Sequence, residues 1–194
     1  MIQDIFALKI FRANMIGYET IRLETSCAIE AQVLEKGTRY ITGVTVLQQQ
    51  DLNQDLVPNI KNIFQFIDLN IKYYWQQLGY KGRPRLKYHW ANVNFPDGAT
   101  LMHDHAPSPL AGCFYVDVPE NSGDLFLANP LEILLRYQPF EEQSIRHNEF
   151  PFDHRIEVSN GMLVMWPGYL VHRSGTNHSG KNRVLIGFDV DFEE

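Results

Sequence analysis

The chain is poor in cysteine and carries no excess of positive charge. Only two cysteines, Cys27 and Cys113, occur among 194 residues. They are too few for a disulfide framework, and they favour a reducing, cytoplasmic setting. Acidic residues outnumber basic ones and give a formal net charge of −6. Non-specific binding to nucleic acid is therefore excluded as the main function.

Long hydrophobic runs are also missing. The apolar stretches are short and interrupted, so no membrane-spanning segment is expected. The first four residues lack the basic region that begins a secretory signal. Hydrophobic residues at 44% and charged residues at 21% are ordinary for a globular protein. This length fits one domain, expected over residues 1–194.

The first part of the chain predicts one strand and two helices. Residues 4–11 favour a strand, and residues 18–36 favour a helix that ends at Gly37. The clearest helix follows Pro58, where apolar residues recur every three or four positions from Ile60 to Leu78. Gly79 ends that pattern. Such an apolar stripe is far more often a packing face than a cofactor site.

Short β-rich runs replace the helical pattern after Pro84. They cover residues 86–95, 111–118, 124–128, 162–166 and 183–192, and turn signals rich in Gly, Pro and Asn separate them. Many short strands predict an antiparallel sandwich or barrel. We therefore expect an α+β, mainly β, fold. Residues 1–83 would provide a first strand and supporting helices, and residues 84–194 a barrel core.

The most informative motif is His103-Asp104-His105. Successive side chains of an extended segment point to opposite faces, so the two histidines share a face and Asp104 looks away. Such a pair can chelate a metal ion, although a His-x-His pair alone is a weak signal. His172 follows a predicted strand and turn that would aim its imidazole inward. A third ligand from a distant strand would leave coordination positions open for chemistry.

The last predicted strand places Arg183 on one of two distinct faces. Arg183 alternates with Leu185, Gly187, Asp189 and Asp191, whereas the other face is wholly apolar. Its guanidinium could therefore point into a cavity and hold a carboxylate by two parallel hydrogen bonds. A surface ion pair is the simpler alternative. Together with the histidines, this arginine suggests an oxygen-activating metal enzyme.

Other candidate residues receive simpler interpretations. Residues 130–160 mix cationic and aromatic side chains with few strand signals, which predicts a mobile lid over the site. The remaining histidines are expected on the surface or in loops, and two tryptophans are expected to pack the barrel. These residues are His89, His147, His154 and His178, and Trp90 and Trp166.

Three stretches in this order resemble the core motifs of a known family. They are His103–Val116, Gly123–Pro130 and Gly161–Arg183. They resemble those of 2-oxoglutarate/Fe(II) oxygenases related to the prolyl hydroxylases, and the resemblance covers residues 84–192. It implies a double-stranded β-helix, a cupin-like jelly-roll barrel with N-terminal supporting helices.

The resemblance also implies roles for individual residues. His103, His105 and His172 would be the catalytic Fe(II) ligands. Arg183 would bind the distal carboxylate of 2-oxoglutarate, Tyr115 would donate a hydrogen bond to it, and Asn92 would contact its other end. The implied reaction consumes O2, hydroxylates an amino-acid or peptidyl side chain, and releases succinate and CO2. The partner would then be a small molecule, peptide or protein, and a homodimer is one possible assembly.

One departure from the family pattern keeps two alternatives open. Most 2-oxoglutarate oxygenases have Asp or Glu where this chain has His105. Three neutral imidazoles leave the full 2+ charge on the metal, and imidazole also suits Zn, Cu and Ni. A cupin-type enzyme with three histidines and no 2-oxoglutarate is one alternative. A non-catalytic jelly roll that binds sugar or protein is the other.

Overall fold

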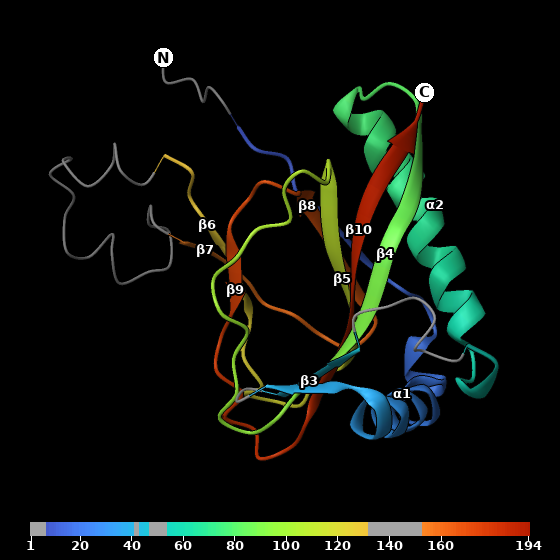
Figure 1. Ribbon diagram of the computed structural model, residues 1–194, viewed down its shortest axis with the longest axis vertical. Helices are drawn as coiled ribbons and strands as arrows, with labels where there is room; N and C mark the ends of the chain where they lie inside the picture. Colours follow the sequence, from blue (N-terminus) through green and yellow to red (C-terminus); the bar gives the residue numbers. More distant parts are fainter. Residues whose placement is uncertain (1–6, 41–42, 47–53, 132–152) are drawn as a thin grey trace, which may run out of the picture.

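The computed structural model describes residues 7–40, 43–46, 54–131 and 153–194 (Figure 1). Two antiparallel β-sheets form its centre, and two helices cover the outer face of the larger sheet. In chain order the elements are β1 (Phe11–Asn14), η1 (Tyr18–Thr20), α1 (Arg22–Lys36), β2 (Thr38–Tyr40), β3 (Gly43–Val46), η2 (Gln54–Leu56), α2 (Ile60–Leu78), β4 (Arg83–Asn94), β5 (Leu110–Asp117), β6 (Leu125–Ala128), β7 (Asp153–Ile156), β8 (Met162–Pro167), β9 (His172–Ser174) and β10 (Arg183–Glu193).

The larger sheet has the strand order β1-β8-β5-β10-β4-β3-β2, and the smaller has the order β7-β6-β9. Buried side chains of β5, β8 and β10 pack against those of β6 and β7 to form the core between the sheets. The arrangement is the double-stranded β-helix that the sequence predicted, and the five strands expected after Pro84 are all present. No helix within the described ranges is long and apolar enough to cross a membrane.

Helix α2 covers the larger sheet with the face that its periodicity predicted. Ile60, Ile63, Ile67 and Ile71 are each at most 1% exposed and pack against side chains of β4, β5 and β10. Burying one such side chain contributes about 1.5–3 kcal/mol relative to leaving it in water. The helix ends at Gly79, which adopts the left-handed conformation at φ 71°. Helix α1 likewise ends at Gly37, as expected.

Three features of the N-terminal and middle regions differ from the sequence prediction. The first strand was predicted over residues 4–11, but residues 7–10 are not in a strand, β1 begins at Phe11, and residues 4–6 lie outside the described residues. Within residues 7–10, the Lys9 carbonyl accepts a hydrogen bond from the Tyr74 hydroxyl of α2. Strands β2 and β3 extend the sheet beside β4 but are too short to show an alternation. Strand β7 lies within the segment predicted as a lid, and residues 132–152 of that segment lie outside the described residues.

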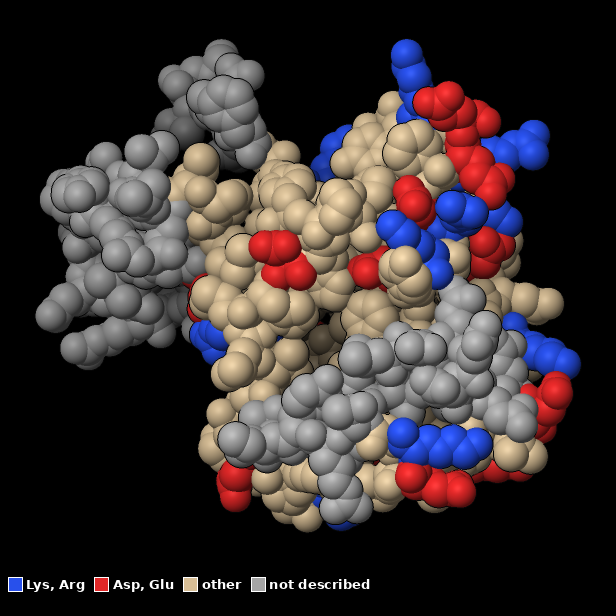
Figure 2. Space-filling model, in the orientation of Figure 1, with Lys and Arg blue, Asp and Glu red and all other residues tan. Residues whose placement is uncertain are grey.

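Strand β10 shows the predicted alternation. Val184, Ile186 and Phe188 belong to the core beneath the helices, whereas Leu185 belongs to the core between the sheets. Charged residues at the start of β4 and the end of β10 form ion pairs. They are Arg85, Lys87, Asp191 and Glu193. Charges of both signs gather at the upper right of Figure 2. The centre of that view carries few charges and is hollowed between the sheets.

Candidate metal centre and cosubstrate wall

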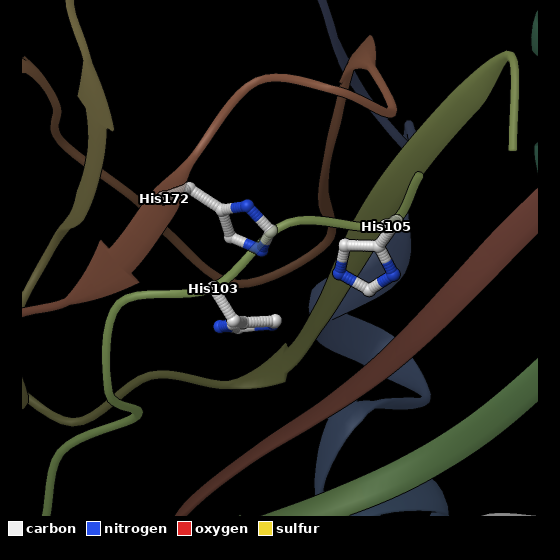
Figure 3. A group of neighbouring side chains, drawn as sticks. All are labelled: His103, His105 and His172. Carbon is white, nitrogen blue, oxygen red and sulfur yellow. The ribbon is translucent and has the colours of Figure 1, made fainter. Parts of the chain in front are cut away.

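The three histidines of the motif lie together at the mouth of the barrel. Their ligand atoms are all within 4.8 Å of one another, and the rings face a common point (Figure 3). His103 and His105 come from the loop between β4 and β5, and His172 is the first residue of β9. Two segments far apart in the sequence therefore supply one cluster of imidazoles.

Backbone hydrogen bonds hold these two segments together. The N–H of His103 donates to the carbonyl of His172 at 3.0 Å, and the N–H of His172 donates back at 2.8 Å. The N–H of His105 donates to the Gly168 carbonyl at 2.8 Å. The prediction that His103 and His105 lie on a strand is wrong, since the structure has a loop with a single β-bridge. Backbone hydrogen bonds nevertheless hold this loop as they would hold a strand, and the rings of His103 and His105 still converge.

Each histidine presents the same nitrogen to the cluster. Nδ1 of His103 lies 2.7 Å from the Leu101 carbonyl, and Nδ1 of His172 lies 3.1 Å from the Leu170 carbonyl. A carbonyl only accepts, so both Nδ1 atoms carry the proton and both Nε2 atoms keep a free lone pair. Nδ1 of His105 lies 2.7 Å from a carboxylate oxygen of Asp189. Histidines that bind metals in proteins are oriented in this way.

Burial favours the neutral form of two of the imidazoles, those of His172 and His103. It lowers the pKa of His172 to about 3, with a further contribution from the nearby His103. Burial also lowers the pKa of His103. Trp166, which is fully buried as predicted, packs against the His172 ring with centroids 4.7 Å apart. A metal ion binds only unprotonated imidazole, so this environment suits metal binding at neutral pH. The residues present therefore fit a metal ion.

Two further residues support His105, and the sequence interpretation had assigned neither to the site. Trp90 stacks on the His105 ring with centroids 5.5 Å apart and 11° between the planes. It lies across Gly187, where an added Cβ would come within 2.5 Å of the indole. Asp189 contacts the same ring from β10. The alternation of the strand in the sequence placed Gly187 and Asp189 on one face. It did not show that they contact Trp90 and His105.

Arg183 is only 1% exposed and lies on the inner face of β10. Its Nη1 donates to the carbonyls of Ser122 and Gly123 at 2.8 and 2.9 Å, and its Nη2 lies 3.3 Å from Oδ1 of Asn94. Burial lowers the pKa of the guanidinium. The surface ion pair weighed as an alternative is therefore wrong.

The Nε–H of Arg183 is buried and has no hydrogen-bond partner among the residues that the structure describes. A buried charged donor without an acceptor is costly, so this edge of the guanidinium suits an incoming carboxylate. Two more orphaned buried groups, Ser122 Oγ and Trp166 Nε1, belong to residues of the same interior. The donor set fits the acceptor-rich cosubstrate that the sequence implied.

Tyr115 and Asn92 share this wall. Both stand directly opposite Leu185, from β5 and β4 respectively, so they point to the same side of the sheet as Arg183. Tyr115 is 3% exposed, and burial raises the pKa of its hydroxyl well above the ordinary value. The hydroxyl therefore remains a hydrogen-bond donor at neutral pH.

The other histidines that the structure describes are not part of this site. His154 and His178 are exposed, as expected, and His147 lies outside the described residues. The prediction for His89 is wrong, since it is 4% exposed on the helix side of β4 and packs against Phe64 with ring centroids 4.6 Å apart. Its place in the β4 alternation, with Ala91 and Val93, explains the burial.

Comparison with known proteins agrees with this geometry. Residues 88–189, more than half of the chain, match the family described as "Putative 2OG-Fe(II) oxygenase". No curated protein matches the sequence.

Solved structures share the fold at low sequence identity. The epimerase SnoN in complex with Fe3+, alpha ketoglutarate and nogalamycin RO aligns with a TM-score of 0.66 and 16% identity, over 94% of this chain and 78% of that chain. The carbocyclase SnoK from nogalamycin biosynthesis gives 0.63 and 17%, over 94% and 79%. A prolyl-4-hydroxylase from Pseudomonas putida gives 0.61 and 11%, over 96% and 94%.

Proposed function

The chain belongs to the 2OG-Fe(II) oxygenase family, and from this premise we propose that it hydroxylates an amino-acid or peptidyl side chain. It is a 2-oxoglutarate-dependent oxygenase whose cofactors are Fe(II), 2-oxoglutarate and O2. Family membership argues against both alternatives, the cupin enzyme without 2-oxoglutarate and the non-catalytic jelly roll. When bound, iron and cosubstrate supply the oxidising chemistry, in which 2-oxoglutarate is converted to succinate and CO2.

His103, His105 and His172 are the proposed metal ligands. The observation that carries this assignment is the convergence of three Nε2 atoms whose partner Nδ1 atoms each face an acceptor. Three protein ligands leave the remaining coordination positions for cosubstrate and O2. Backbone hydrogen bonds between the two ligand segments hold the rings in place before any ion arrives.

Arg183 is the proposed anchor for the distal carboxylate of 2-oxoglutarate. Its Nη1 is held by two backbone carbonyls, so the side chain is fixed and the Nε edge is left for a ligand. Tyr115 is the proposed hydroxyl donor to the cosubstrate, and Asn92 the proposed contact at its other end. The surrounding apolar core excludes water, which strengthens each of these polar contacts.

The proposed substrate class, an amino acid or a peptide, draws on family resemblance and on the similarity to a prolyl-4-hydroxylase fold. The epimerase and the carbocyclase among the similar structures mark the main competing outcomes. Mass spectrometry separates the three, because hydroxylation adds one oxygen atom, cyclisation removes two hydrogens, and epimerisation leaves the mass unchanged.

The proposal is tested by anaerobic loading with Fe(II) and 2-oxoglutarate, followed by exposure to O2. We expect succinate in the wild-type protein, with more formed when free proline or a proline-containing peptide is present. The His172→Ala variant should form none. Succinate without an oxygen-containing product in a broad panel of amino acids and peptides would contradict the substrate class. An absence of 2-oxoglutarate-dependent turnover would contradict the assigned cosubstrate site.

A further inference from the structure

Asp189 on β10 has a side chain that is 15% exposed, but its Oδ1 atom is buried. Its Oδ1 lies 2.7 Å from Nδ1 of His105, although the ring is not aligned for a linear hydrogen bond. No other partner of this oxygen occurs among residues 7–40, 43–46, 54–131 and 153–194. A buried carboxylate oxygen without a donor is costly, so the His105 N–H is the group that can satisfy it.

The local backbone is shaped to bring Asp189 to this place. The register of β10 against β4 shifts between Asp189 and Val190. Irregularities of this kind re-aim a side chain and are common beside active sites. Trp90 lies directly opposite Gly187 in the same pair of strands, and its indole stacks on the face of the His105 ring. His105 is therefore held by a carboxylate at its edge and an indole on its face.

We propose that Asp189 is a positioning residue for the metal centre. Its carboxylate accepts a hydrogen bond from the Nδ1–H of His105 and thereby holds Nε2 of that ring toward the metal. The inference rests on the proposed three-histidine ligand set. Asp104 is the carboxylate nearest to His105 in the sequence, but it does not accept the His105 N–H. Asp104 instead accepts the N–H of Ala106 and is exposed.

The Asp189 carboxylate also offsets the positive charge that three neutral ligands leave on the metal ion. Three imidazoles leave 2+ on the ion, whereas the commoner set with one carboxylate ligand leaves 1+. Asp189 restores one negative charge at the outer edge of His105. That charge also acts on His103, where it slightly raises the pKa that burial lowers. A carboxylate on the far nitrogen makes an imidazole a stronger donor, and loss of such a partner typically lowers metal affinity about 10–100-fold.

The test measures metal binding without turnover. Co(II), which reports its ligand geometry through visible absorption, is titrated into the full-length protein in competition with a chelator. The variants are Asp189→Ala, Asp189→Asn and the matched control Asp104→Asn, which removes the same charge from the ligand loop. The thermal unfolding of each metal-free variant is recorded alongside, because a merely structural role would lower it and leave the Co(II) spectrum unchanged.

We expect Asp189→Ala to weaken Co(II) binding about 10–100-fold and to shift the spectrum. Asp189→Asn can still accept the N–H, so it should weaken binding less and keep the spectrum. Asp104→Asn should match the wild type. Wild-type affinity and spectrum in Asp189→Ala would overturn the inference. If Asp189→Ala does not fold, the Co(II) affinities of Asp189→Asn and Asp104→Asn are compared instead. Equal affinities of these two variants would overturn the inference. A wild-type protein that binds no Co(II) would instead overturn the ligand set itself.

Discussion

The two faces of β10 differ in what they bury. Toward the helices, Val184, Ile186 and Phe188 are fully buried in an apolar core. Toward the smaller sheet, the strand carries Arg183 and Asp189, each with a buried polar atom that lacks a hydrogen-bond partner within the described part of the chain. Buried polar groups are normally satisfied. The helix side of the strand is therefore complete as it stands. On the other side, Arg183 keeps a donor for a group that arrives from outside, and Asp189 faces the Nδ1 atom of His105.

The largest expected effect comes from removing a metal ligand on the inner face. His103→Ala, His105→Ala and His172→Ala should each lose metal affinity beyond the roughly 10–100-fold typical of an outer partner. Metal analysis after purification and Co(II) titration measure this. Asp104→Ala is the control and should retain metal. Full metal occupancy in His105→Ala together with loss in Asp104→Ala would show that the ligands are wrongly assigned.

The next effect concerns Arg183 and cosubstrate binding. A charge-assisted hydrogen bond contributes on the order of 1.5–3 kcal/mol, so Arg183→Ala should weaken 2-oxoglutarate binding by roughly one to two orders of magnitude. Arg183→Lys keeps the charge without the fork and should fall between. Calorimetric titration of the metal-loaded proteins measures both affinities.

Arg183→Ala should also lower stability, because it leaves the carbonyls of Ser122 and Gly123 without their donor. Metal content should not change, since a guanidinium does not ligate cations. Arg85→Ala, which removes a charge from the exposed end of β4, is the matched control and should bind 2-oxoglutarate normally. Unaltered affinity in a folded, metal-loaded Arg183→Ala protein would contradict the anchor.

A pair of glycines compares the two faces directly. An added Cβ at Gly187 would meet Trp90 at 2.5 Å, and one at Gly112 would meet Phe188 at 2.5 Å in the helix-side core. Overpacking of this kind costs typically about 1–3 kcal/mol, so both Gly→Ala variants should lower the unfolding temperature. Only Gly187→Ala should also weaken Co(II) binding, through the displaced Trp90. Equal metal affinities in the two variants would remove the distinction between the faces.

The smallest expected effect belongs to His89, a buried polar residue on the helix side. Burial lowers its pKa. The unfolded chain therefore binds the proton more readily, so stability is lost as pH falls below the unfolded value of about 6.5. One such group contributes a slope of at most about 1.4 kcal/mol per pH unit. Chemical denaturation at pH 7.5 and pH 5 should show a smaller loss for His89→Leu than for the wild type. His178→Leu, at an exposed position, should behave as wild type.

The sequence predicted elements whose pattern is local and repeated. Helix α2 follows from the spacing of its isoleucines, and the two faces of β10 follow from strict alternation. The histidine cluster was predicted from the His103-Asp104-His105 motif and its neighbouring turn signals, together with the family resemblance that assigned His172 as the third ligand. In the helix and the strand, the residues that carry the pattern are close together in the chain.

Contacts between distant residues outside the family motifs were not predictable. Asp189 was seen on the right face, but its contact with His105 depends on how a loop folds over the barrel. The carbonyls that hold Arg183 belong to a turn whose position no periodicity reveals. His89 was taken for a surface residue because histidine tolerates both environments, and only its phase with Val93 places it inside.

Backbone hydrogen bonds join His103 to His172 and His105 to Gly168, so the positions of the ligand-bearing main chain do not depend on which side chains it carries. Main-chain atoms set the spacing, so an exchanged side chain inherits a position that is already built. The codons for His and Asp differ only in their first base. A single nucleotide change at position 105 can therefore convert this ligand set into the commoner one without refolding. Selection can accordingly adjust metal preference and cosubstrate affinity in one step while the scaffold is conserved.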